Sequence, residues 1–109
     1  MIKSLSLLTR KSTLSKEEFR RIWLGEHAPL VHAVPQVRRY VLSFPLSEPT
    51  RPDVPTQAVS VDAVAELWYD DMASLQAAAA SPQMKTVTDN GALYLAAIKT
   101  FITEEVTII

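Results

Sequence analysis

The sequence has no cysteine and only two glycines, and these absences exclude several kinds of chemistry. Without cysteine there is no disulfide, no thiolate metal site, no iron–sulfur ligand and no cysteine nucleophile. The absence fits a reducing compartment, although many exported proteins also lack cysteine. With glycine present only at Gly25 and Gly91, the chain has no glycine-rich loop of the kind that binds phosphate.

The chain also lacks an excess of one charge and a long apolar run. It has 11 Lys and Arg against 12 Asp and Glu, well interspersed, which gives no reason to expect nucleic acid or an anionic membrane as a partner. Although 48% of the residues are hydrophobic, no stretch reaches the roughly 18 apolar residues of a membrane helix. Residues 1–9 are too short and too polar for a signal peptide. We therefore expect a cytoplasmic protein of bacterial type.

What is present predicts a single domain over residues 1–109. Ser15 and Glu18 have the spacing of a capping box, and Pro29 predicts a kink because it has no N–H to donate. The pair Asn90 and Gly91 predicts the end of the last helix. The predicted helical regions are residues 16–34, 71–80 and 82–90.

Apolar and β-branched runs predict strands at residues 2–9, 37–44, 59–69 and 99–109. The order of elements is then βαββαβ, which is typical of an α+β ferredoxin-like fold. In that fold a four-stranded antiparallel sheet carries two helices on one face. Between the second and third strands, residues 45–58 carry four prolines and predict a long loop whose role the sequence leaves open.

Both faces of the predicted sheet are apolar. Tyr40 and Leu42 alternate with Val41, and Leu67 alternates with Trp68, yet two helices cover only one face. An exposed row of such residues predicts a partner surface, and a second copy of the chain is the simplest cover. We therefore expect a homodimer through the sheet faces, the alternative being that the loop at residues 45–58 covers the second face.

The sequence LSKEEFRRIWLGEHAPLV at residues 14–31 resembles the signature of the EthD family. VPQVRRY at residues 34–40 continues the resemblance, with Gln36 where glycine is common in the family. VAELWYDD at residues 64–71, followed by ASP at residues 80–82, is similar to the family's second block. The resemblance covers nearly the whole chain and keeps its spacing.

This resemblance implies a dimeric α+β barrel. It also implies a choice of functions, because the family is similar to proteins of ether-fuel degradation, to isomerases of methylated muconolactones and to dehydratases or cyclases of aromatic polyketides. Their shared theme is acid–base chemistry on small cyclic or aromatic molecules without a cofactor.

His27 is the predicted catalytic residue. On a helical wheel it falls at the edge of the apolar stripe that contains Trp23, whereas His32 falls on the opposite side. An imidazole titrates close to neutrality, which suits a general acid or base. The alternative is a structural histidine bonded to the Gly25 carbonyl, and in either case Glu26 is a candidate to orient the ring.

Trp23, Tyr40, Glu66 and Trp68 are the predicted substrate-binding residues. Aromatic walls suit a flat apolar ligand, and tyrosine and tryptophan add a polar atom. The alternative for the aromatic residues is plain core. Glu66 is either a cross-strand ion-pair partner or a second acid–base group.

No metal and no cofactor are expected, because two histidines five residues apart on opposite sides of a helix are a poor ligand pair. Three functions remain open. The first is a cofactor-independent lyase, isomerase or cyclase that acts on a small apolar ring compound in catabolism or polyketide-like metabolism. The second is a non-catalytic binding or accessory protein of a degradation pathway. The third is a structural dimer module.

Overall fold

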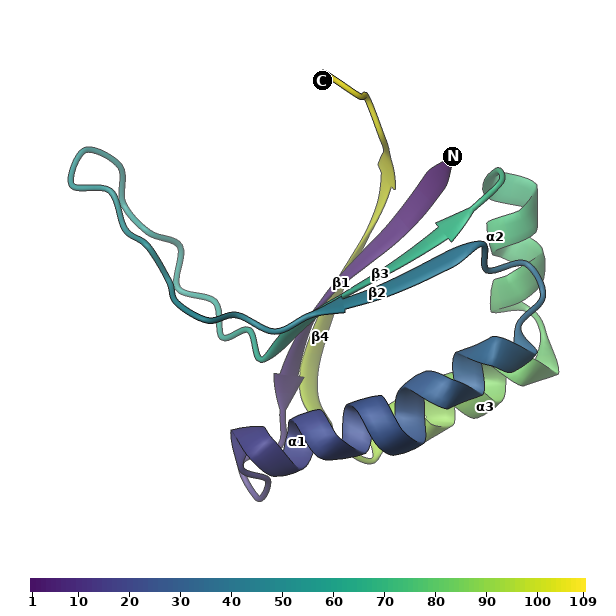
Figure 1. The fold of residues 1–109 in the computed structure, drawn as a ribbon, viewed down its shortest axis with the longest axis horizontal. Helices are drawn as coiled ribbons and strands as arrows, with labels where there is room; N and C mark the ends of the chain where they lie inside the picture. The colour runs from purple at the N-terminus through teal and green to yellow at the C-terminus, as the bar shows by residue number, and fades with distance from the viewer.

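The computed structural model describes all residues from 1 to 109, which form one antiparallel sheet with the helices on one side of it (Figure 1). The sheet has the strand order β2-β3-β1-β4, as in the predicted ferredoxin-like fold. The elements, in chain order, are β1 (Ile2–Arg10), α1 (Lys16–Ile22), the π-helical turn η1 (Trp23–His27), the 3₁₀ helix η2 (Ala28–Ala33), β2 (Arg39–Ser43), β3 (Ala63–Tyr69), α2 (Met72–Ala79), α3 (Pro82–Ala92) and β4 (Leu95–Glu104).

The first helical region begins and bends where the sequence predicts. The Ser15 hydroxyl accepts from the Glu18 amide at 3.1 Å, and the Glu18 carboxylate accepts from the Ser15 amide at 3.2 Å. After Ile22 the α-helix gives way to η1 and then to η2, which contains Pro29. Since Pro29 has no N–H for the Gly25 carbonyl, a regular α-helix cannot continue through this segment. The predicted kink is thus a π-helical turn followed by 3₁₀ helix, a geometry frequent at functional sites.

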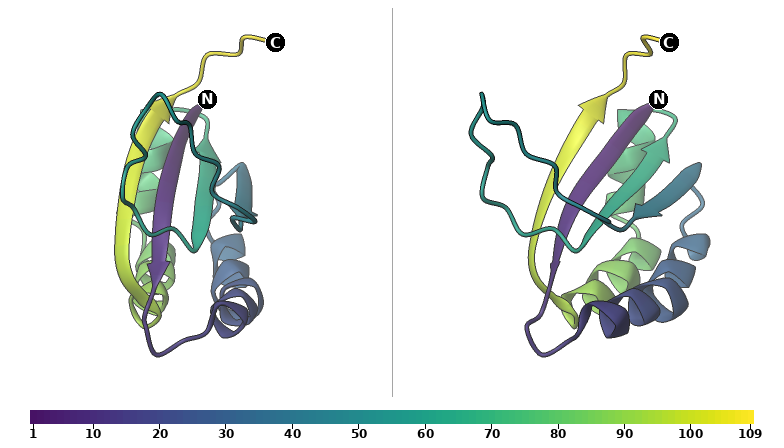
Figure 2. Two further views of the ribbon diagram at one scale, coloured as in Figure 1. Left: turned by 90° about the vertical axis from the view of Figure 1, so that its left-hand side faces the viewer. Right: turned by 60° about the vertical axis from the view of Figure 1, so that its left-hand side comes forward.

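The second helical region is two helices, α2 and α3, so three α-helices cover one face of the sheet instead of two (Figure 2). Asp71 caps α2 by accepting from the Ser74 amide, and Ser81 caps α3 by accepting from the Met84 amide. The predicted end at Asn90 is wrong, because α3 continues to Ala92.

Strand pairing determines which side chains lie on each face of the sheet. Ser4, Ser6 and Leu8 of β1 alternate with Lys3, Leu5 and Leu7. The first set faces the helices, as do Ala63, Ala65, Leu67 and Tyr69 of β3. Two groups of buried side chains lie between sheet and helices. One is Leu8, Phe19, Trp23, Ala63 and Ala65, and the other is Val31, Val34, Tyr69, Ala78 and Val87.

The other face of the sheet has no helix, and the segment between β2 and β3 does not close it. This segment projects away from the sheet (Figure 1, teal). All residues from 45 to 60 are exposed, and Leu46 is 97% exposed. The alternative in which this loop covers the second face is therefore not what the structure shows. No helix in the chain is both long and apolar enough to span a membrane.

Candidate functional site

A cavity of about 590 Å³ lies between the sheet and the helices. The strands β1, β2, β3 and β4 form its floor, while η1, η2, α2 and α3 form its walls. Most of the lining is apolar, and the volume falls in the range of sites that bind small molecules. His27, Trp23 and Tyr40, three of the residues singled out from the sequence, line this cavity.

His27 is held in a defined orientation in the wall of the cavity. Its side chain is 6% exposed and stacks on the Trp23 indole, with ring centroids 3.7 Å apart and planes at 25°. Its Nδ1 lies 2.9 Å from Oδ1 of Asn90, so with the amide oxygen as acceptor the proton is on Nδ1. Nε2 makes no hydrogen bond within the protein and is not sealed from solvent.

Burial lowers the pKa of His27, and the bond to Asn90 opposes this only in part. A lowered pKa keeps the imidazole neutral at neutral pH, with an unprotonated Nε2. The site therefore has the protonation state of a base.

The hydrogen-bond acceptor for Nδ1 of His27 is neither of the two candidates that the sequence suggested. It is neither the Gly25 carbonyl nor Glu26 but Asn90, which is 63 residues away along the chain. Glu26 is exposed, and its carboxylate accepts from the Tyr94 hydroxyl at 3.5 Å. Asn90 is thus a site residue that sequence reasoning assigned to the end of a helix.

Gly91 explains how α3 comes close enough for this contact. A Cβ at this position would lie 3.2 Å from Cε1 of His27 and 3.3 Å from Cη2 of Trp23. The φ angle of Gly91 is not positive, so what sets this position apart is the limited space beside it and not its backbone conformation. The adjacent Asn90 and Gly91 therefore serve the site together, one as acceptor and the other by its lack of a side chain.

Tyr40 and Trp23 add two polar atoms to the cavity. Burial raises the pKa of Tyr40 to about 12, which keeps its hydroxyl protonated. The Trp23 indole lies close enough to oppose that rise weakly, but it does not meet the geometry of a hydrogen bond, and its N–H is buried without an acceptor. We treat the indole N–H as unpaired, because a contact outside hydrogen-bond geometry contributes little energy.

The floor of the cavity contributes hydroxyl groups from the paired strands β1 and β4. Ser6 Oγ and Thr100 Oγ1 are 2.7 Å apart and hydrogen-bonded, and Ser4 lies two residues along β1 on the same face. These side chains are uncharged and each has hydrogen-bonding capacity beyond a single bond.

Glu66 and Trp68 do not line this cavity. They lie on β3 with the opposite parity to Leu67 and so face the helix-free side of the sheet. Glu66 accepts from Lys3 Nζ at 2.9 Å, which is the ion-pair alternative. The Trp68 indole donates to Glu105. Neither residue is a candidate contact for a ligand beside His27.

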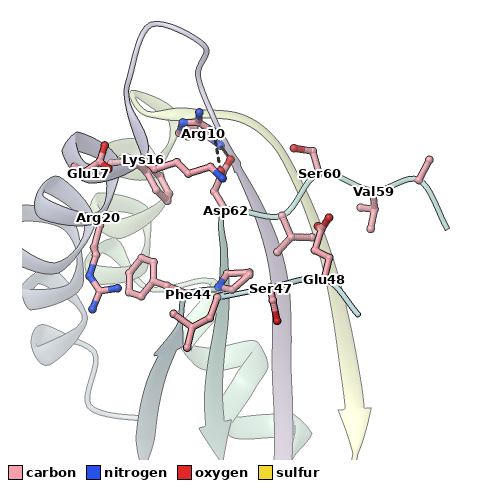
Figure 3. Close-up of a pocket in the computed structure, with 15 residues that line it drawn as sticks. Arg10, Lys16, Glu17, Arg20, Phe44, Ser47, Glu48, Val59, Ser60 and Asp62 are labelled. Carbon is pink, nitrogen blue, oxygen red and sulfur yellow. Dashed lines mark hydrogen bonds and ion pairs between the residues drawn. The ribbon is translucent and has the colours of Figure 1, made fainter. Parts of the chain in front are cut away.

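A second and larger cavity, of about 850 Å³, lies at the base of the projecting segment (Figure 3). Among its charged residues, Arg10 pairs with Asp62 at 2.7 Å and Arg20 lies over the Phe44 ring at 4.5 Å. Neither histidine lines it. We place the candidate site at His27 despite the smaller volume, because that cavity holds an oriented base. No group of three or more His, Cys, Asp or Glu in the chain could hold a metal ion.

Known proteins resemble this chain in sequence. Residues 11–94 match the EthD domain family. Over 106 residues the chain is 28% identical to the 4-carboxymethyl-4-methylbutenolide mutase of Pseudomonas reinekei, which covers 96% of this chain and 98% of the mutase.

Two solved structures are similar in fold. An ethyl tert-butyl ether d (EthD) family protein from Bacillus halodurans has a TM-score of 0.78 at 22% identity, over 97% of this chain and 99% of that one. A dimeric ferredoxin-like protein of unknown function from Thermobifida fusca has a TM-score of 0.70 at 16% identity, over 94% and 88%. The domain match spans most of the sequence, and on that ground the chain belongs to the EthD family.

Proposed function

We propose that this chain is a cofactor-independent acid–base enzyme of the isomerase, lyase or cyclase type, with His27 as its proton-transfer group and a small ring compound carrying a carbonyl or lactone as substrate. One observation carries the proposal: His27 is fixed through Nδ1 by Asn90 and keeps Nε2 free in an apolar cavity. A base held by a second side chain beside a cavity is the arrangement that proton transfer requires.

The proposed step is a proton shift along the ring. His27 Nε2 takes a proton from a carbon next to the carbonyl, and the electron pair of the C–H bond moves onto the carbonyl oxygen. The Tyr40 hydroxyl donates a hydrogen bond to that oxygen while it carries charge. The imidazolium then returns the proton to another ring carbon, so the double bond moves and no atom is gained or lost.

The similarity to the mutase supports this class of reaction. A butenolide is an unsaturated lactone, and a mutase rearranges its substrate without a net change in atoms. A structural module would need no cavity of this size, whereas a non-catalytic binding protein would use the same cavity and is separated from an enzyme by the test below.

The test is proton exchange in D₂O, followed by NMR, with a 3-butenolide as the probe, because this unsaturated lactone has a saturated ring carbon next to its carbonyl. We expect deuterium to enter the ring at a rate that His27→Gln lowers by roughly 10²–10⁴-fold. His32→Gln changes an exposed histidine and should leave the rate unaltered. Binding of a butenolide without exchange would refute the enzyme and favour the binding protein.

We also propose that a second copy of the chain covers the helix-free face of the sheet, giving the dimeric barrel. This face carries Leu5, Leu7, Val41, Val64 and Trp68, and the projecting segment leaves it uncovered. Similar structures from Thermobifida fusca and Bacteroides fragilis are described as dimeric. The His27 cavity lies on the other side of the sheet, so each subunit would hold a complete site.

A further inference from the structure

The His27 cavity has no charged side chain in its lining. Its 23 residues include no Asp, Glu, Lys or Arg. An ionised group that enters such a cavity loses its water and finds no opposite charge, which is one of the most unfavourable events in molecular recognition. The absence of charge from the walls thus makes the cavity unfavourable for a ligand with an ionised group.

The basic residues of the neighbouring strands are directed elsewhere. Lys3 and Lys99 pair in register with residues of the helix-free face, and Arg39 lies over the Trp68 ring on that same face. Arg10 is bound to Asp62 at the base of the projecting segment. A carboxylate in the cavity would therefore have no cation of this chain beside it.

The polar groups that do face the cavity are neutral. His27 is an unprotonated imidazole at neutral pH because burial lowers its pKa, and Tyr40 is a protonated phenol. Ser6 and Thr100 are hydroxyls already bonded to each other. These groups offer one base and a few hydrogen-bond donors, which match carbonyl, lactone or phenol oxygens.

Trp23 extends this neutral donor set. Its side chain is 2% exposed, and its indole N–H has no acceptor although nearly all buried donors in proteins have one. The Tyr40 hydroxyl lies close enough for the indole to affect its pKa, although the two groups fall short of a hydrogen bond. A small shift on ligand binding would let the indole donate to the Tyr40 oxygen and leave the Tyr40 proton for the ligand. Trp23 is in this sense a positioning residue.

The exposed part of the cavity lining is mostly apolar, with Thr88 and Thr100 as its polar members. Ile98 and Ile102 of β4 line it and are 58% and 53% exposed. Apolar side chains at a mouth favour apolar substituents on a ligand that extends from the cavity. The open side of the cavity is therefore, like its walls, an unfavourable environment for a charged group of a ligand.

We propose that this cavity takes an uncharged ring compound with a carbonyl, lactone or phenol oxygen and apolar substituents, and that it discriminates against carboxylates. The inference rests on the proposed function of the same site and narrows its substrate class. It also predicts a substrate preference different from that of the relative named for a carboxymethyl butenolide, because a carboxymethyl group is ionised at neutral pH.

The test compares 4-carboxymethyl-4-methylbutenolide with its methyl ester at pH 7.5, with binding followed by the NMR shift of the Trp23 indole N–H. We expect the ester to bind at least tenfold more tightly than the acid. Equal or tighter binding of the acid would overturn the proposal, and so would failure of both compounds to bind. Tight binding of the ester, together with no deuterium exchange into the 3-butenolide, would uphold the neutral ligand and refute the enzyme.

A gain-of-function variant gives a second, independent measurement. Ile98→Lys places a cation at the exposed mouth, where the fold tolerates it, and should raise affinity for the acid at least tenfold relative to the ester. Ile98→Gln is the matched control, polar but uncharged, and should leave the preference for the ester in place. An unchanged acid-to-ester ratio in Ile98→Lys would count against the proposal. Trp23→Phe, with binding followed by the NMR signals of the ester itself, should weaken ester binding, and intact binding would remove Trp23 from the donor set.

Discussion

Asn90 and Gly91 lie on the last turn of α3 and act on the same ring of His27. The Asn90 amide holds Nδ1, and the missing side chain of Gly91 lets the helix approach within van der Waals distance. Orientation and close approach are separable by mutation, because each depends on a different residue.

The two glycines of the chain provide a matched pair of variants. Gly91→Ala forces a methyl group against His27 and Trp23, and overpacking of this kind costs about 1–3 kcal/mol of unfolding free energy. Gly25→Ala meets nothing within 4 Å and should stabilise the helical region by about 0.5–1 kcal/mol. Thermal melting measures both. A Gly91→Ala variant as stable as Gly25→Ala would show that the space beside His27 is not needed.

The lowered pKa of His27 predicts how stability depends on pH. In the unfolded chain the imidazole has its ordinary pKa of 6.5, so below that value the unfolded state binds more protons than the folded one. The contribution of His27 is therefore fully present above pH 6.5 and is lost as the pH falls through the lowered folded value. Urea unfolding at several pH values should show this slope, and His27→Gln should reduce it.

The control for this slope is His32→Gln, which removes an exposed histidine and should keep the wild-type dependence on pH. If His27→Gln retained the full slope, another group would be responsible for it.

Sequence reasoning located His27 but not its partner, and the reason is physical. Helical spacing depends on neighbouring residues and placed His27 on the inner stripe beside Trp23. The bond to Asn90 joins two helices and depends on how they pack, which no local pattern encodes. Asn followed by Gly is also a common pattern at the end of a helix, and this pattern accounted for both residues without a role in the site.

At the scale of elements, α1 is a seven-residue helix that depends on its cap. Ser15→Ala removes the side-chain acceptor for the Glu18 amide and should cost about 1 kcal/mol, measured as a lower midpoint in urea. Because Trp23 directly follows this helix, fraying would also loosen one wall of the cavity. Ser12→Ala, at an exposed position outside the helix, is the control, and an equal loss there would refute the capping role.

Strand ends were harder to predict than strand identity. The β-branched run suggested a strand at residues 99–109, whereas β4 occupies Leu95–Glu104. Glu104 pairs with Ile2 at the beginning of β1, so the following residues have no strand to pair with. β3 begins at Ala63 and not at residue 59, because Asp62 turns its carboxylate to the Arg10 amide and guanidinium. A strand ends where its partner ends, and propensity alone does not contain that information.

At the scale of the whole molecule, the proposed dimer predicts a mass of about twice that of the chain at micromolar concentration, as measured by light scattering. Trp68→Glu places a charge in the helix-free face and should shift the protein toward monomer without unfolding it. Leu93→Glu, at a residue 60% exposed outside the sheet, should remain dimeric. A wild-type chain that is a stable monomer would refute the dimer.

The sequence alone could not predict that Glu66 and Trp68 lie on the face of the sheet without helices. The period of two correctly separated Trp68 from Leu67 and Tyr69, but alternation alone does not say which face the helices cover. The fold and the family could be predicted from element order and motif resemblance. The structure confirms the fold, and the match to the EthD domain confirms the family. The choice of face needed the packing of α2 and α3 on the sheet.

That choice of face has a spectroscopic consequence. The chain has two tryptophans, one on each side of the sheet, in unlike surroundings. Trp23 is stacked on an imidazole in the cavity, so its fluorescence should respond to whatever enters there. Trp68 lies among Lys3, Arg39 and Glu105 on the opposite face, so its emission should respond to the approach of another subunit. Replacing one tryptophan by Phe leaves the other as the only one in the chain. The fluorescence of Trp23 then reports occupancy of the cavity, and that of Trp68 reports assembly of the dimer, without an added label.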